Sequence, residues 1–81
     1  PAIAKLGEMF GQQQLFPLIQ ISDKVLRLAP GGRIIDENNR TLLHSYLPKY
    51  AQVLFVEDMN GELSLVYILR PDELEQFQRA R

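Results

Sequence analysis

Residues 53–71, VLFVEDMNGELSLVYILRP, decide the fold. Two runs of apolar, β-prone residues flank an Asn-Gly pair at positions 60–61. Such a pair is typical of a two-residue type I′ turn between antiparallel strands. With this turn, Phe55 lies opposite Val66 in the paired register. The segment therefore predicts a β-hairpin over about residues 52–69.

Both faces of this hairpin are apolar. One face carries Val53, Phe55, Val66 and Ile68, and the other carries Leu54, Val56, Leu63, Leu65 and Tyr67. A hairpin with one side in water alternates apolar and polar residues, and this one does not. Each large side chain is worth about 1.5–3 kcal/mol when it is buried rather than exposed. Leaving half of them in water would forfeit a sum comparable to the stability of a small domain, so we expect both faces to be covered.

The remaining sequence predicts two or three short helices as that cover. Two asparagines precede a helix predicted at 40–47, which ends at Pro48. Pro71 suits the first position of a helix predicted at 71–80, and the two acidic residues after it favour the positive end of the helix dipole.

An N-terminal helix is predicted at 2–16 from the spacing of its apolar residues. Ile3, Leu6 and Phe10 recur at steps of three and four, which places them on one helical stripe. Pro17 disfavours helical geometry in the residue before it. Two glycines weaken the helix, and the GQQQ stretch inside it fits a loop equally well.

Residues 22–30 fit two structures. Ser22 is a suitable cap for a short helix at 23–29. The same residues also alternate as a strand, which the Pro-Gly-Gly sequence at 30–32 would join to a second strand. Because this turn signal is strong, the sequence favours a second hairpin at 24–37.

The length of the chain indicates a single domain over residues 1–81, and the predicted hairpin and helices give it an α+β class. Apolar residues make up 46% of the chain and charged residues 23%, as in ordinary folded proteins. Cysteine is absent and His44 is the single histidine, so we expect no metal site and no cofactor. The apolar runs are shorter than the roughly 18 residues that span a bilayer, and the first residues lack a secretory pattern. We expect no membrane contact and a cytoplasmic location.

The distribution of charge argues against nucleic acid as a partner. The formal net charge is −1, and the nine basic residues are scattered, whereas phosphate binding usually requires a clustered basic face. The alternative is a winged-helix DNA-binding regulator that reads DNA with residues 40–47 and uses the hairpin as its wing. Against it, Glu57, Asp58 and Glu62 surround the wing tip, where basic residues are needed.

Pro1 is the feature that would support an enzyme. An N-terminal proline serves as a secondary-amine base in the tautomerase family, where it opens directly into a β-strand. The residues after Pro1 have helical spacing instead. His44 has no nucleophile beside it, and adjacent carboxylates such as Glu57 and Asp58 are not positioned as an acid–base pair. We therefore expect no enzymatic activity.

Association is the remaining way for a cysteine-free chain of this size to gain stability. The sequence predicts a non-catalytic interaction or regulatory module that acts through protein–protein contacts and forms a twofold homodimer through its hairpin. Aromatic residues are enriched among the residues that dominate binding energy. The predicted partner-binding residues are Phe55, Leu65, Tyr67, Leu43 and Tyr46.

Overall fold

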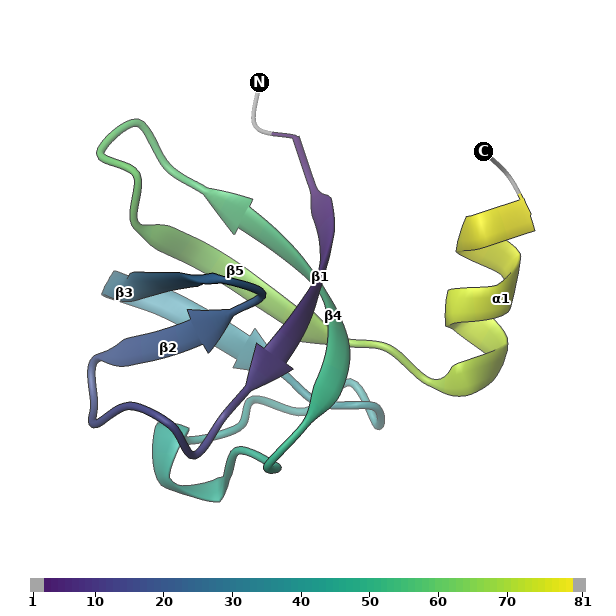
Figure 1. Cartoon of the computed structure of the whole chain (residues 1–81), viewed down its shortest axis with the longest axis horizontal. Coiled ribbons are helices and arrows are strands. Elements are labelled where there is room, and N and C mark those ends of the chain that lie inside the picture. The colour runs from purple at the N-terminus through teal and green to yellow at the C-terminus, as the bar shows by residue number, and fades with distance from the viewer. Residues whose placement is uncertain (1–2, 80–81) are drawn as a thin grey trace.

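Five strands and one α-helix form within residues 3–79, the part of the chain that this computed structural model describes (Figure 1). The strands are β1 (Lys5–Phe10), β2 (Leu18–Ile21), β3 (Lys24–Ile35), β4 (Ala51–Glu57) and β5 (Leu63–Ile68), and the helix is α1 (Pro71–Arg79). A single 3-10 turn, η1 (His44–Tyr46), lies between β3 and β4. Pro1, on which the enzyme hypothesis rested, lies outside the described residues.

The strands close into a barrel in the order β1-β2-β3-β5-β4, and β4 pairs with β1. Neighbouring strands are antiparallel except β3 and β5, which run parallel with Ile34 opposite Val66. This strand order belongs to the five-stranded Greek-key barrels, the class that includes the OB-fold. Because such architectures host many unrelated functions, the topology assigns none here.

The expectation of an α+β fold is wrong. Strands account for 47% of the residues and helical structure for 14%. The inner face of the β4–β5 ribbon is covered by the other strands of the barrel and not by helices. The buried core consists of Met9, Ile19, Ile21, Ile34, Leu47, Val53, Phe55, Leu63, Val66 and Ile68. The apolar pattern of the ribbon showed that it needed cover, but it could not show which elements supply it.

β1 replaces the helix predicted at 2–16. Gly7, in the middle of this strand, is buried. A Cβ atom at Gly7 would lie only 2.8 Å from Ile21 Cγ2 and 2.8 Å from Phe55 Cε1. Glycine therefore allows these two core side chains to pack directly against the β1 backbone. The buried positions of β1 alternate as Gly7 and Met9, so Leu6 and Phe10 of the predicted helical stripe lie on the opposite face of the strand and are only half-buried.

β3 is one long strand, so the helix predicted at 23–29 and the hairpin predicted at 24–37 are both wrong. Its first half pairs with β2 as far as Arg27, and it pairs with β5 at Leu28 and again from Arg33 to Ile35. The register against β5 shifts between Leu28 and Arg33. The Pro-Gly-Gly sequence at 30–32, whose middle glycine has a φ of 80°, bends the strand where a hairpin turn had been expected.

The helix predicted at 40–47 is reduced to the η1 turn. Asp36 Oδ1 accepts hydrogen bonds from the backbone N–H groups of Asn38 and Arg40, both at 2.9 Å. Asn39 adopts a φ of 64°, and the chain after this tight turn pairs briefly with the end of β3. The hydrogen bonds to the Asp36 carboxylate therefore stabilise a turn at the place where the sequence predicted the start of a helix.

The β4–β5 hairpin is confirmed, including the predicted register at its centre. The type I′ turn is wrong, because Gly61 has a positive φ of 75° whereas Asn60 does not. Asp58 Oδ1 accepts hydrogen bonds from the N–H groups of Asn60 (2.8 Å) and Glu62 (3.0 Å). The result is a three-residue loop in which a type I turn precedes a left-handed residue. Residues 36–40 form the same arrangement around their own aspartate.

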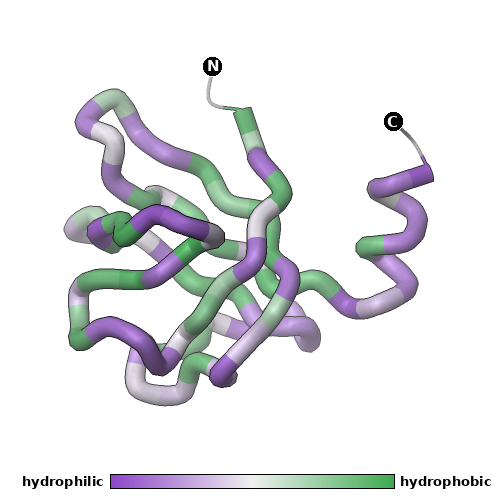
Figure 2. Tube along the Cα trace, viewed as in Figure 1, coloured by the Kyte–Doolittle hydropathy of each residue, from purple (hydrophilic) through white to green (hydrophobic). Residues whose placement is uncertain are grey.

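The helix predicted at 71–80 is confirmed as α1 over its described length. Glu73 Oε1 accepts a hydrogen bond from the Arg70 N–H at 3.0 Å, which satisfies a donor at the start of the helix. Figure 1 shows α1 beside the barrel next to β4, and Figure 2 shows that most of its residues are hydrophilic. No helix within residues 3–79 is long and apolar enough to cross a membrane.

The outer face of the β4–β5 ribbon is only half-buried. Its side chains at Leu54, Val56, Leu65 and Tyr67 are all partly exposed. Tyr67 Oη donates to Glu73 Oε2 at 3.4 Å, which links this face to α1. The ribbon therefore has a dry inner face and a partly covered outer face.

We expect Gly7→Ala to lower the free energy of unfolding by about 1–3 kcal/mol, because the new methyl group would displace Ile21 or the Phe55 ring in a packed interior. Urea unfolding followed by circular dichroism measures this change. Lys24→Ala, at an exposed position of β3, is the control and should change the value by less than about 0.5 kcal/mol. Equal losses in the two variants would contradict the interior packing described above.

Candidate functional site

One end of the barrel is built from the β1–β2 connection and the β3–β4 connection. The four most exposed large apolar side chains on these connections are Leu15 (87% exposed), Phe16 (69%), Leu43 (65%) and Tyr46 (70%). We refer to these four residues as the apolar end. Single exposed apolar residues are ordinary on protein surfaces, whereas several together are characteristic of surfaces that bind a partner.

Specific contacts hold the two connections together. His44 Nε2 lies 2.7 Å from the Leu18 carbonyl oxygen, and the Phe16 and His44 rings meet edge to face with centroids 5.5 Å apart. Gln12 Nε2 donates to the Leu47 carbonyl oxygen at 3.3 Å, and the Leu47 side chain is part of the buried core. The exposed apolar residues therefore stand on segments that are anchored to the barrel.

Two hollows flank a ridge formed by Phe16, Leu43 and His44, and all three residues line both of them. The first hollow, of about 540 Å³, lies between the two connections, and Leu15 and Leu47 are among its lining residues. The second hollow, of about 360 Å³, lies between the ridge and the β3 bend at 30–32. The two hollows form one continuous apolar surface with two recesses.

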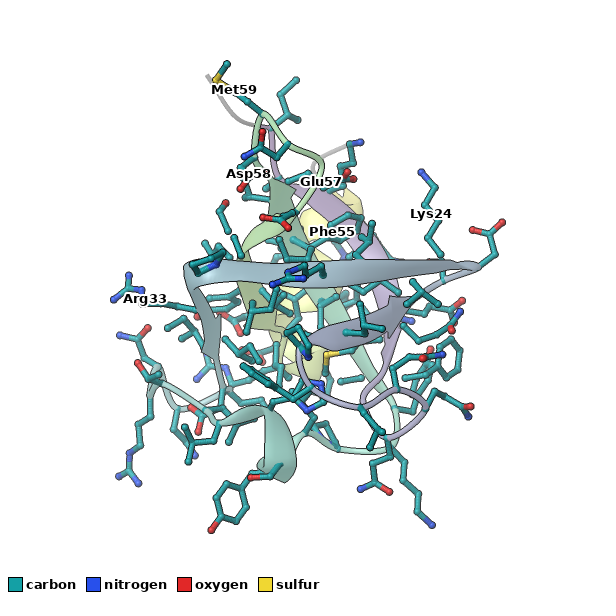
Figure 3. All side chains as sticks on the ribbon, turned by 90° about the vertical axis from the view of Figure 1, so that its left-hand side faces the viewer. Lys24, Arg33, Phe55, Glu57, Asp58 and Met59 are labelled. Carbon is teal, nitrogen blue, oxygen red and sulfur yellow. The ribbon has the colours of Figure 1, made fainter. Side chains whose placement is uncertain are left out.

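Charge around the hollows is positive. Arg27 and Arg33 line the second hollow, and no carboxylate from residues 3–79 lines either hollow. Arg27 Nε lies 3.4 Å from a carboxylate oxygen of Glu62. Arg33 projects outward (Figure 3) and forms no ion pair with any described residue. An apolar ligand that carries a carboxylate would match the hollows in polarity and in charge.

The β4–β5 loop, at the other end of the barrel (Figure 1), has the opposite character. Met59 is fully exposed at its tip and points away from the barrel, beyond Glu57 and Asp58 (Figure 3). Glu57 pairs with Lys5 at 3.6 Å. The loop thus presents one apolar side chain within an acidic surrounding.

The five predicted partner-binding residues do not come together. Leu43 and Tyr46 belong to the exposed apolar end. Phe55 is buried inside the barrel, while Leu65 and Tyr67 are half-buried on the outer face of β5. A contact surface at the apolar end therefore includes two of the five and leaves the other three in the barrel wall.

Sequence reasoning missed Leu15 and Phe16. The signal was present, because an apolar pair stands between three glutamines and Pro17 in a segment that the GQQQ stretch already marked as a possible loop. The predicted helix at 2–16 was based on Ile3, Leu6 and Phe10, and it gave these two residues no role. Once they are placed in a connection, their exposure follows.

No protein-family model, curated protein or solved structure matches this chain. Within residues 3–79, no group of three or more histidine, aspartate or glutamate side chains is arranged to hold a metal ion. Function is therefore inferred from the shape and chemistry of the apolar end and its two hollows.

Tyr50 is a titratable residue whose environment changes its pKa. Its hydroxyl donates to Glu8 Oε2 at 2.7 Å. This hydrogen bond, together with some desolvation and the nearby negative charge, raises the pKa of Tyr50, and a hydrogen bond from Gln52 opposes the shift. The hydrogen bond to Glu8 stabilises the neutral phenol, so its contribution is present below the ordinary tyrosine pKa of about 10 and is lost as the pH rises through the raised value.

We expect Glu8→Gln to lower the pKa of Tyr50. The substitution replaces the carboxylate that accepts the hydrogen bond of the Tyr50 hydroxyl with a neutral amide, so the neutral phenol is stabilised less. Ultraviolet titration of the phenolate measures the change, and Tyr50→Phe, as the control, identifies which part of the titration belongs to Tyr50. An unchanged Tyr50 titration in Glu8→Gln would show that the two side chains are not paired.

Proposed function

We propose that this domain is a non-catalytic protein-interaction module whose contact surface is the apolar end with its two hollows. The observation that carries this function is that Leu15, Phe16 and Leu43 are all more than half exposed although the segments that bear them are anchored. A surface held in place before binding loses little conformational entropy when a partner arrives.

The size of the surface supports a specific contact. Burying one large apolar side chain is worth about 1.5–3 kcal/mol, and a few well-packed anchors dominate the affinity of most interfaces. Phe16 and Leu43 form the centre of such a set, because each borders both hollows. The glutamines and Ser45 beside the first hollow supply the polar rim that is typical of protein interfaces.

Nucleic-acid binding has less support. OB-type barrels that bind oligonucleotides use the face of β2 and β3 with the β1–β2 and β4–β5 loops. Here the residues from Gly11 to Pro17 carry no charge, and the β4–β5 loop is acidic around Met59. The reading helix of a winged-helix protein is not formed at 40–47. We place the module in the cytoplasm, because small secreted domains are commonly rich in disulfides and this chain has no cysteine.

The test is selection of peptides from a displayed random library on the immobilised domain. We expect enrichment of peptides with large apolar residues and a carboxylate, and we expect Leu43→Ser to weaken their binding at least about tenfold, as the loss of one buried leucine contact implies. Ile3→Ser is the matched control, because Ile3 is also exposed (75%) and precedes β1 at the opposite end of the barrel (Figure 1).

Peptides that bind Leu43→Ser as tightly as the unmodified domain would place the contact surface elsewhere. Failure to enrich any peptide that competes at the apolar end would remove the support for this function. Circular dichroism of both variants verifies that the fold is intact, which is expected because both substituted side chains are exposed.

A further inference from the structure

We propose, resting on the proposed function, that the occupant of the hollows is the β4–β5 loop of a second copy of this chain. In the resulting twofold dimer, Met59 of each copy enters a hollow beside Phe16 and Leu43 of the other. Asp58, which precedes Met59, then faces Arg33. The contact would cover Met59 and the apolar end, which are both exposed in the described part of the chain.

The loop is built to present Met59. Hydrogen bonds from two backbone N–H groups to Asp58 Oδ1 fix the turn, and Gly61 N–H donates to the Asp58 carbonyl oxygen at 3.0 Å. The Met59 side chain is nevertheless fully exposed, so it contributes nothing to the core. An unbranched thioether side chain adapts to recesses of irregular shape, and a rigid turn delivers it at little cost in entropy.

The hollows match this loop in polarity and charge. Both are lined mainly by apolar side chains, and their only fully charged residues are Arg27 and Arg33. Glu57, Asp58 and Glu62 surround Met59 on the loop. Within the chain, Glu62 already pairs with Arg27 and Glu57 with Lys5, so the charges available to a partner are those of Arg33 and Asp58. Opposite charges on two apolar surfaces favour this contact and its orientation.

The placement of the two features permits a closed dimer. The β4–β5 loop and the β3 bend, which lines the second hollow, lie on the same side of the barrel, at the left of Figure 1. Figure 3 shows that side face on, with Met59 at one extremity and Arg33 on the flank. When donor and acceptor share a face, a twofold axis between two copies makes both contacts at once, and the assembly closes instead of growing into a fibre.

Sedimentation equilibrium of the unmodified 9.3 kDa chain over a concentration series provides the test. We expect the mass to rise with concentration to that of a dimer and no further. Met59→Asp and Leu43→Asp should each weaken dimerisation at least about tenfold, since each substitution removes an apolar side chain from both of the loop-to-hollow contacts in the dimer. Gln76→Asp adds the same charge to an exposed position of α1, on the other side of the barrel (Figure 1), and should leave the mass unchanged.

Mixing the two variants gives the decisive result. Met59→Asp retains an intact hollow and Leu43→Asp retains an intact loop, so an equimolar mixture should form a heterodimer with one native contact, although each variant alone is monomeric. A monomeric unmodified chain at all concentrations, or a dimer indifferent to Met59→Asp, would overturn the self-docking inference. Peptide binding lost on Leu43→Ser would still stand in either case, so the proposed function and this inference fail separately.

Discussion

Parallel pairing between β3 and β5 is the constraint on which the structure depends. It closes the barrel, and closure turns the inner face of the β4–β5 ribbon into a core that needs no helix. It also requires β3 to pass from β2 at Arg27 to β5 at Leu28 and to resume this pairing at Arg33 in a shifted register. The bend at 30–32 meets that requirement, and it forms one wall of the second hollow. A candidate binding surface is thus a consequence of closing the sheet.

The apolar residues of this chain divide into two groups with different roles. Those of the barrel interior, together with Leu47 of the β3–β4 connection, form the buried core that stabilises the fold. Those of the connections, above all Phe16 and Leu43, are exposed at fixed positions. A closed barrel has no exposed sheet edges through which to associate, so the proposed contacts use its ends. The β4–β5 loop is acidic, and the second hollow beside the apolar end is lined by Arg27 and Arg33.

Local signals in the sequence were sufficient for the hairpin and for α1, because each is fixed by residues close together in the chain. β1, the bend of β3 and the loss of the helix at 40–47 depend on contacts between distant segments or on one carboxylate, that of Asp36. Among the predicted site residues, the alternation of the strands placed Phe55 on one face of the ribbon. It did not show that this face lies inside a barrel. Leu43 was predicted to bind a partner as part of a helix at 40–47 that does not form. It is exposed because it lies on the β3–β4 connection.

Intermolecular paramagnetic relaxation tests most directly whether the barrel's two ends bind each other. Because the chain has no cysteine, Asn60→Cys carries a single nitroxide label beside Met59. When this labelled chain is mixed with chain that carries no nitroxide and is enriched in ¹⁵N, we expect broadening of the amide signals at 28–33 and 41–44 and none in α1. Absence of broadening at millimolar concentration, or broadening spread evenly over the surface including α1, would contradict this expectation.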